Sequence, residues 1–225
     1  MKKFSLWFIT SLLRVYFRLT MRLDISGLEK VPMQGPLIVI SNHTGQVEVP
    51  VLATVLQPRK IGGWGKAEAF KNPLLRWVFW AWDIIPIHRG EADMTALKSA
   101  LRNLQDGYIF GIAPEGTRNK TGILRRAMPG TAILAVRSGV TVLPIVHWGG
   151  ENYLKNLKRF KRTDFHLRVG EPFKVHVEDK ITAEVRQRVV DEMMYKIAEL
   201  MPAEYRGEYS DMSKAGYKYL RASGQ

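Results

Sequence analysis

A histidine and a glutamate five positions apart, His43 and Glu48, could together form a general base. Residues 37–40, just before them, are apolar, mostly β-branched and uninterrupted by polar residues, which is typical of a strand buried on both faces of a sheet. His43 is then expected at the carboxyl end of that strand, where open α/β sheets form their binding crevice. Residues from 50 onward look helical, so the carboxylate of Glu48 can accept the imidazole Nδ1 proton and leave Nε2 free as a base.

The spacing of this pair is weak evidence by itself. Three of the five histidines have an acidic residue five positions later, and chance alone should supply about half a match of this kind. His166 lies where apolar and polar residues alternate, which favours a strand residue that faces solvent. His88 follows a short apolar run and could also end a strand. His43 ranks first because a buried strand precedes it and a helix follows it.

A second chemical site is predicted in the loop at residues 114–122, after the apolar run 108–113. Because this run also reads as a buried strand, the loop should open onto the same crevice as His43. Gly116 allows close backbone approach, and Arg118 offers a planar fork suited to phosphate or carboxylate. Further cations follow at Lys120, Arg125 and Arg126. The alternative is a solvated surface loop rich in arginine.

Composition limits the classes of chemistry and of partner. The 225 residues, of which 46% are hydrophobic, suffice for one α/β domain with a substantial core. The absence of cysteine excludes thiol catalysis, disulfides and cysteine-ligated zinc. The formal net charge of +13 favours an anionic partner such as nucleic acid, a phospholipid surface or a phosphorylated substrate.

Residues 4–22 are rich in apolar and aromatic residues and contain no acidic residue. Arginines recur there at every fourth position: Arg14, Arg18 and Arg22. The uncharged part is shorter than the about 20 residues that a bilayer-spanning helix needs, and no cleavage site of a signal peptide follows it. We therefore expect residues 1–24 to form an amphipathic helix in an anionic membrane interface. The alternative is a helix that packs on the domain's own core and has a basic outer face.

Strand and helix patterns alternate along the rest of the chain. Strand-like apolar runs occur at residues 60–64, 84–87, 108–113 and 140–146. Helical patterns lie between them, at residues 74–82, 92–105 and 128–138. This alternation predicts an α/β fold in which helices cover a mainly parallel central sheet.

The helix at 74–82 holds three tryptophans and a phenylalanine within six residues and has almost no polar face. Core packing is its default interpretation, and contact with lipid or an acyl chain is the alternative. Residues 164–177 predict a closing hairpin or strand pair, and 182–200 an amphipathic helix. We expect the main domain to span residues 25–202, with 203–225 as a mobile polar tail or a membrane-facing flap.

Five short motifs follow one another at or near the ends of the predicted strands. They are Asn42-His43 with Glu48, Lys66-x-Glu68-x-Phe70, Ile85-Pro86-Ile87-His88-Arg89, Pro114-Glu115-Gly116-Thr117-Arg118 and Val142-Leu143-Pro144-Ile145. In this order and approximate spacing, over about residues 25–175, the chain resembles the glycerolipid (lysophospholipid) acyltransferases. Each motif is unspecific alone, and their succession makes the signal specific.

The resemblance implies a role for each matched position. His43 is similar to the general base that takes the proton of the acceptor hydroxyl, and Glu48 stands where the family normally has the aspartate that holds this imidazole. The cations that resemble the family's phosphate-binding residues are Lys66, Arg89 and Arg118. The residues that match its substrate-binding loop are Glu115, Gly116 and Thr117. His88 falls in the phosphate-binding block, so the resemblance implies that it is not the base.

The implied reaction moves a fatty acyl group from a thioester, acyl-CoA or acyl-carrier protein, to a lysophospholipid such as lysophosphatidic acid. An anionic membrane surface is the implied location, as a peripheral or monotopic protein on the cytoplasmic face of the cell membrane. Neither a metal nor a further cofactor is expected, because His43 and Glu48 lack additional ligands at a recognisable spacing.

Three alternatives stay open at this point. The acceptor could be a sugar or an amino-acid lipid. The glutamate at position 48 keeps a noncatalytic, membrane-binding role with a vestigial site possible. The net charge and the basic run Lys155, Lys158, Arg159, Lys161 and Arg162 suggest nucleic acid, although the run lacks any recognised binding module and nucleic acid is not expected as a partner.

Overall fold

The computed structural model of this chain describes residues 2–45, 47–87, 93–178 and 180–223. The strands are β1 (Met21–Ser26), β2 (Leu37–Ile40), β3 (Ile61–Lys66), β4 (Ile84–Ile87), β5 (Ile109–Ile112), β6 (Val142–Trp148), β7 (Thr163–Val169), β8 (Phe173–Val175) and β9 (Leu220–Ala222). The α-helices are α1 (Lys2–Thr20), α2 (Glu48–Val55), α3 (Pro73–Ala81), α4 (Met94–Gln105), α5 (Ala132–Ser138), α6 (Tyr153–Leu157) and α7 (Ala183–Leu200).

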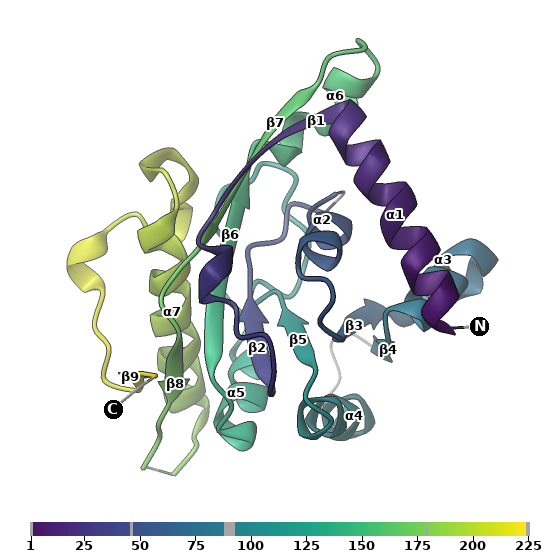
Figure 1. Ribbon diagram of the computed structural model, residues 1–225. Coiled ribbons are helices and arrows are strands. Elements are labelled where there is room, and N and C mark those ends of the chain that lie inside the picture. The colour runs from purple at the N-terminus through teal and green to yellow at the C-terminus, as the bar shows by residue number, and fades with distance from the viewer. Residues whose placement is uncertain (1, 46, 88–92, 179, 224–225) are drawn as a thin grey trace.

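The strands form one sheet in the order β1-β7-β6-β2-β5-β3-β4 (Figure 1). The run from β6 to β4 is parallel throughout, whereas β7 is antiparallel to β6 and β1 is parallel to β7. The prediction of an α/β fold with a mainly parallel sheet is therefore confirmed. The carboxyl ends of β2, β3, β4, β5 and β6 meet at one edge, as a crevice at that edge requires.

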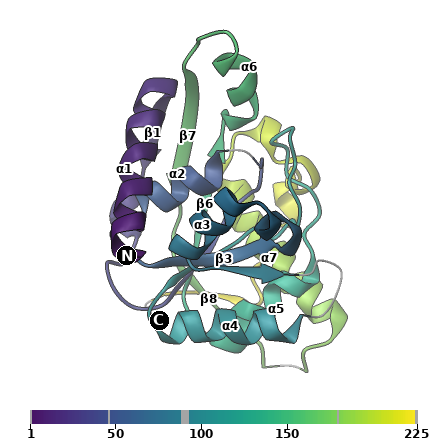
Figure 2. The same cartoon turned by 90° about the vertical axis from the view of Figure 1, so that its right-hand side faces the viewer.

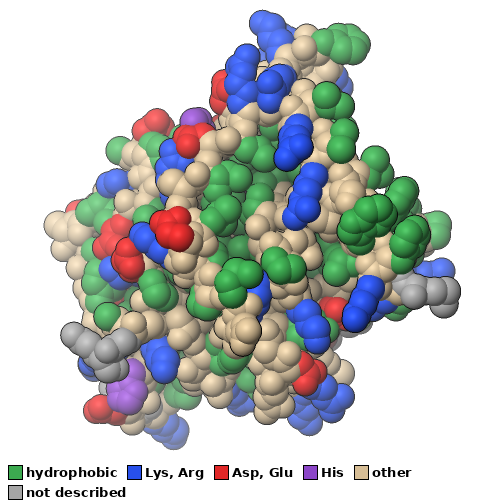
Figure 3. All heavy atoms as spheres, in the orientation of Figure 1, with side chains coloured by type: hydrophobic (Ala, Val, Ile, Leu, Met, Phe, Trp, Pro, Cys, Tyr) green, Lys and Arg blue, Asp and Glu red, His purple; other side chains and the backbone are tan. Residues whose placement is uncertain are grey.

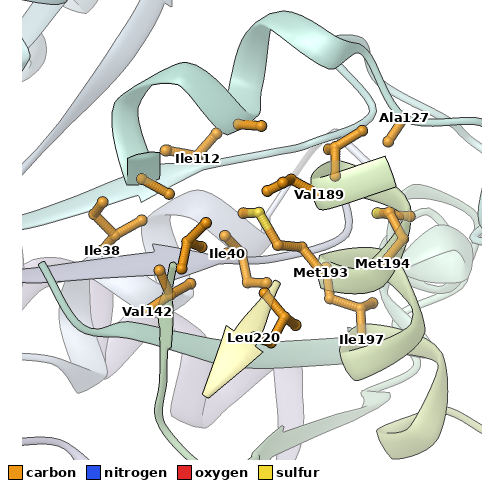
Figure 4. Packing of buried hydrophobic residues seen from close by; sticks show 14 of the residues in the cluster. Ile38, Ile40, Ile112, Ala127, Val142, Val189, Met193, Met194, Ile197 and Leu220 are labelled. Carbon is orange, nitrogen blue, oxygen red and sulfur yellow. The ribbon is translucent and has the colours of Figure 1, made fainter. Parts of the chain in front are cut away.

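Helices cover both faces of this sheet, and β2 contributes to both cores. Ile38 and Ile40 pack in one cluster with α4, α5 and α7, part of which Figure 4 shows. Leu37 and Val39 point to the other face and pack with α1 and α2. In Figure 2, α4 and α2 lie on opposite sides of the sheet. All four β2 side chains are buried, and burial of such a side chain is worth about 1.5–3 kcal/mol, so β2 is anchored from both sides.

The predicted amino-terminal helix is shorter than expected. α1 ends at Thr20, and the next residues form β1, which pairs with β7 about 140 positions later in the sequence. Arg22 therefore lies on a strand, 3.3 Å from Asp164, and not on the helix with Arg14 and Arg18. Pairing over such a sequence distance leaves no local pattern, which is why β1 was not expected.

The tryptophan-rich helix α3 differs from its default interpretation. Of its residues only Ala81 is buried, and four large side chains are more than one-third exposed: Leu74, Leu75, Trp77 and Trp80. α3 packs beside α1 at the edge of the molecule, so its apolar face is not part of the central core. Among the described residues, none of the helices combines the length and apolar character needed to cross a bilayer.

The carboxyl-terminal segment is also more ordered than a tail. Residues 203–214 contain three short 3₁₀ turns, and β9 pairs with β8. Tyr209 is buried, and its hydroxyl donates to Asp191 of α7 at 2.8 Å. Two strands do lie in the region 164–177, but β7 and β8 each pair with β6 and not with one another. The expected closing hairpin is therefore replaced by two pairings to the same central strand.

Candidate active site

His43 and Glu48 meet at the carboxyl end of β2. Glu48 is the first residue of α2, and its Oε1 lies 2.7 Å from Nδ1 of His43. The carboxylate is 2% exposed, whereas the imidazole keeps partial access to solvent. Among the described residues, no protein group bonds to Nε2 of His43, so this nitrogen is available to accept a proton.

Backbone groups aim the Glu48 carboxylate back across the turn. The N–H of Gly45 donates to Oε1 at 2.6 Å, and the N–H of Val47 donates to Oε2 at 3.1 Å. Gly45 has φ +103°, a conformation in which glycine is favoured. The start of a helix also favours negative charge, so position 48 suits an ionised carboxylate.

Burial and the neighbouring histidines set the ionisation of Glu48. Burial alone would raise the pKa of this carboxyl, but the hydrogen bond to His43 and nearby positive charge outweigh burial and lower the pKa to about 2. Glu48 therefore carries its charge at neutral pH. An ionised partner on Nδ1 orients the imidazole and stabilises the imidazolium that forms when Nε2 takes a proton.

The buried carboxylate of Glu115 links the loop at residues 114–122 to the backbone of His43. Its Oε1 accepts the N–H of His43 at 3.1 Å, and its Oε2 accepts the N–H of Arg125 at 3.2 Å. The N–H of Asn119 in turn donates to the His43 carbonyl at 2.7 Å. Burial raises the pKa of Glu115, and the two backbone donors oppose this rise. With 4% exposure, Glu115 holds the backbone of His43 in place and does not face an open substrate site.

Arg118 lies next to the turn that contains His43 and Gly45. A Cβ added to Gly45 would come within 2.7 Å of Arg118 Cδ, so the arginine side chain passes directly over this glycine. Arg118 and Thr117 are exposed, and Gly116 has φ +68°. The structure thus brings the 114–122 loop and His43 together at one edge of the sheet.

Two further phosphate-binding cations are implied by the resemblance, Lys66 and Arg89, and the structure describes only the first. Lys66 ends β3, two strands from β2 at the same sheet edge, and its exposed Nζ is 3.8 Å from Glu68 Oε1. Arg89 and the neighbouring His88 lie outside the described residues. His166 lies on β7 and bonds to Asp24 through Nδ1 at 2.8 Å, while Glu171, five residues later, pairs with Lys30 instead.

His147 is a residue of the site region that the sequence reasoning missed. It is fully buried at the end of β6, and its Nε2 bonds to the Asn42 carbonyl at 2.8 Å. The Asn42 side chain bonds to both backbone groups of His147, so β6 fixes the residue just before His43. Burial lowers the pKa of His147. The sequence signal that could have indicated His147 is its own position, as a polar residue directly after the strand-like run 140–146.

An apolar cavity of about 140 Å³ begins at this site. His43 and Glu48 form part of its wall. Leu52 of α2 and Trp82, which follows α3, also line it. Its floor contains Gly63 and Gly111, which pair across β3 and β5. A Cβ at Gly111 would have only the Gly62 carbonyl oxygen within 4 Å, at 3.7 Å, so the missing side chain leaves open space there. The described residues hold no cluster of three or more His, Asp or Glu side chains that could bind a metal ion.

Comparison with known proteins agrees with this geometry. The chain is 25% identical, over 76% of its length, to the chloroplastic 1-acyl-sn-glycerol-3-phosphate acyltransferase BAT2 of Brassica napus, of which the match covers 50%. It is 34% identical, over 65% of its length, to N-acylphosphatidylethanolamine synthase of Arabidopsis thaliana, of which 58% is covered. The chain thus spans about half the length of these curated relatives.

A solved structure is also similar to this fold. The 1-acyl-sn-glycerophosphate acyltransferase PlsC from Thermotoga maritima superposes with a TM-score of 0.66 at 25% identity, over 85% of this chain and 77% of that one. The family model described as Acyltransferase matches residues 22–148, which include His43, Glu48, the 114–122 loop and His147. With more than half of its length matched, the chain belongs to the acyltransferase family.

Proposed function

We propose that this protein transfers a fatty acyl group from a thioester donor to the free hydroxyl of lysophosphatidic acid or a related lysophospholipid. The observation that carries the proposal is the His43–Glu48 pair, 2.7 Å apart, at the mouth of an apolar cavity. The names of the similar proteins, a 1-acyl-sn-glycerol-3-phosphate acyltransferase and PlsC, support the same activity. Acyl-CoA and acyl-carrier protein are both candidate donors, and no metal or other cofactor enters the proposal.

The proposed reaction needs no nucleophile on the enzyme. Nε2 of His43 accepts the hydroxyl proton while the acceptor oxygen attacks the thioester carbonyl carbon. The tetrahedral intermediate then breaks its carbon–sulfur bond, and the proton held by His43 passes to the thiolate that leaves. Glu48 stays ionised and stabilises the transient imidazolium. General-base assistance of this kind is worth about 10²- to 10⁴-fold in rate.

The surroundings of His43 match the two ends of such substrates. The cavity wall and the glycines on its floor suit the apolar acyl chain of the donor. Arg118, which crosses Gly45, is the cation best placed to bind the phosphate of the acceptor. Lys66 at the same sheet edge adds a second positive charge, and Arg89 is proposed in this role on the family resemblance alone.

A membrane supplies the lysophospholipid acceptor, and α1 has an exposed apolar surface that could contact a membrane. Its inward residues include Ile9 and Phe17, both buried, while its other side exposes large apolar side chains. These are Phe4, Trp7, Phe8, Leu12, Val15 and Leu19. We therefore place the protein at an anionic membrane surface, on the cytoplasmic face of the cell membrane, with α1 as a contact.

The decisive experiment incubates purified protein with either acyl-CoA or acylated carrier protein and with mixed lysophospholipid acceptors, and follows the lipids by mass spectrometry. We expect a diacyl phospholipid product, and we expect His43→Ala to lose turnover by orders of magnitude while its folded circular dichroism spectrum is retained. His166→Ala is the matched control, because His166 also pairs with a carboxylate but lies on β7 away from the cavity. Undiminished turnover in His43→Ala would refute the mechanism.

The acceptor list should include amines. The relative with 34% identity is an N-acylphosphatidylethanolamine synthase, so a nitrogen acceptor is a second candidate for the same site. An ammonium must first lose one proton to become a nucleophilic amine, and His43 would then accept the second proton as the amine attacks and pass it to the leaving thiolate. Product masses from phosphatidylethanolamine and from lysophosphatidic acid, measured side by side, separate the two candidates.

A further inference from the structure

The α6 helix and the turn that follows it, residues 153–162, form a projection that stands beyond the end of β6 beside α1 (Figure 1). We call this segment the α6–β7 projection. It contains the basic run that the proposed acyl transfer does not use. Its contacts with α1, the side chain at its tip and its positive charge together indicate what it binds.

The α6–β7 projection is held to the carboxyl end of α1. Tyr153 is buried, and its hydroxyl is hydrogen-bonded with the hydroxyls of Tyr16 and Thr20. Arg162 donates to the backbone carbonyls of Arg18, at 2.9 Å, and Met21. Because the Arg18 carbonyl lies in the last turn of α1, the guanidinium also complements the negative end of the helix dipole. The surface of the projection therefore continues the surface of α1.

Phe160 at the tip has a conformation and an exposure that packing within the chain does not explain. Its N–H donates to Leu157 O at 3.1 Å, and the N–H of Lys161 donates to Asn156 O at 2.9 Å, which together form a Schellman motif. The left-handed position of this motif is usually glycine, yet here it is a phenylalanine with φ +52°. The side chain is 100% exposed. The chain thus keeps a large apolar side chain where folding alone favours glycine.

The residues around Phe160 are positively charged. They are Lys155, Lys158, Arg159 and Lys161, and all four are exposed. Within the described part of the chain, none of the four is within ion-pair distance of a carboxylate; the nearby Asp164 pairs with Arg22. Leu154, at the start of α6, adds a second exposed apolar side chain. An apolar tip surrounded by free cations is complementary to a surface with an apolar interior and anionic headgroups.

This tip is continuous with the other exposed apolar surfaces. Figure 3 shows hydrophobic side chains along the edge of the molecule that α6, α1 and α3 occupy in Figure 1, with Lys and Arg side chains beside them. Figure 2 looks onto this side, with α1 and α3 towards the viewer and α6 above them. A flat bilayer could therefore touch all three at once.

We propose that the α6–β7 projection is a membrane anchor that inserts Phe160 between the headgroups of an anionic bilayer, with the four surrounding cations bound to lipid phosphates. Together with α1 it fixes the orientation of the protein on the membrane. The proposal goes beyond acyl transfer, and it is tested by binding, so its failure would leave the proposed reaction intact.

The first experiment measures cosedimentation with vesicles of phosphatidylcholine and phosphatidylglycerol. Phe160→Gly should bind about tenfold or more weakly, as expected when a buried phenylalanine is lost, while its melting temperature stays equal or rises because glycine suits the left-handed position. Phe160→Asn provides a second variant that tolerates this conformation. The control is Ile181→Gly, an exposed apolar residue before α7, on the other face of the sheet from α1. Unchanged vesicle affinity in both Phe160 variants would overturn the proposal.

The charge is tested with Lys158→Gln combined with Lys161→Gln. Affinity for the anionic vesicles should fall about fivefold for each charge, and affinity for pure phosphatidylcholine should change little. Lys174→Gln combined with Lys180→Gln, two exposed lysines on the α7 side, is the matched control. If the Lys158 and Lys161 variant instead loses affinity for a single-stranded oligonucleotide and keeps its vesicle affinity, the run binds nucleic acid and the proposal is wrong.

Insertion itself can be observed directly because the chain has no cysteine. Phe160→Cys and Ile181→Cys each create one site for an environment-sensitive fluorophore. Anionic vesicles should shift the emission of the label at position 160 to the blue and leave the label at 181 unchanged. Equal emission with and without vesicles at position 160 would show that the tip stays in water.

Discussion

Replacing Glu48 with glutamine removes the charge from the His43 pair while nearly preserving the shape of the side chain. The pKa of this buried carboxyl falls from its ordinary 4.5 to about 2, and one pKa unit corresponds to about 1.4 kcal/mol. Ionised Glu48 therefore contributes about 3 kcal/mol to folding stability at neutral pH. Because the folded pKa is the lower one, this contribution is complete above pH 4.5 and is lost as the pH falls towards 2.

Urea titrations of the wild type and Glu48→Gln at two pH values test this argument. At pH 7 the variant should be less stable by about 3 kcal/mol, and at pH 3 the difference should shrink to about half of that. Acyl transfer should fall about 10²- to 10⁴-fold, because an amide neither stabilises the imidazolium nor selects the Nδ1–H tautomer. Asp24→Asn, which alters the exposed pair with His166, should change both quantities little. A stability difference that does not depend on pH would refute the assigned charge state.

Two further predictions concern the cavity and the buried histidine. Gly111→Val should fold, and in competition assays it should shift the donor preference towards shorter acyl chains, because the valine side chain enters the open space of the cavity. Gly62→Ala is the control. Its added methyl group faces Asn103 on the other side of the sheet and should not shift the preference. His147→Leu should lower the free energy of unfolding by about 1–3 kcal/mol in urea titrations, because the buried carbonyl of Asn42 loses its donor. An unchanged chain-length preference, or a His147→Leu variant as stable as the wild type, would contradict these readings.

The parts of the fold that local pattern encodes were predictable. The run 37–40 has four apolar residues and no polar interruption, and it is a fully buried strand from which His43 emerges at the correct edge. β1 was missed because its partner lies about 140 residues away and its own residues are mostly exposed. α3 was misjudged because a helix without a polar face looks the same in sequence whether its surroundings are core, lipid or solvent.

Within the site, sequence indicated which residues gather but not which way they face. The family resemblance placed Glu115 in the substrate-binding loop. Its carboxylate instead accepts the backbone N–H groups of His43 and Arg125. The direction of a side chain within a loop depends on hydrogen bonds formed after folding, and spacing does not contain that information. For the same reason, the contact between Arg118 and Gly45 became visible only in three dimensions.

The glutamate at position 48 was the main reason to consider a vestigial site. Its extra methylene could have displaced the carboxylate by about one carbon–carbon bond from the imidazole. The structure instead has Oε1 at 2.7 Å from Nδ1, with the N–H groups of Gly45 and Val47 both donating to the carboxylate. A buried charge is costly unless it is paired, and this 2% exposed carboxylate is paired with His43 and two backbone donors. The longer side chain is thus accommodated by the turn, and the carboxylate–imidazole contact on which our proposed mechanism depends is present.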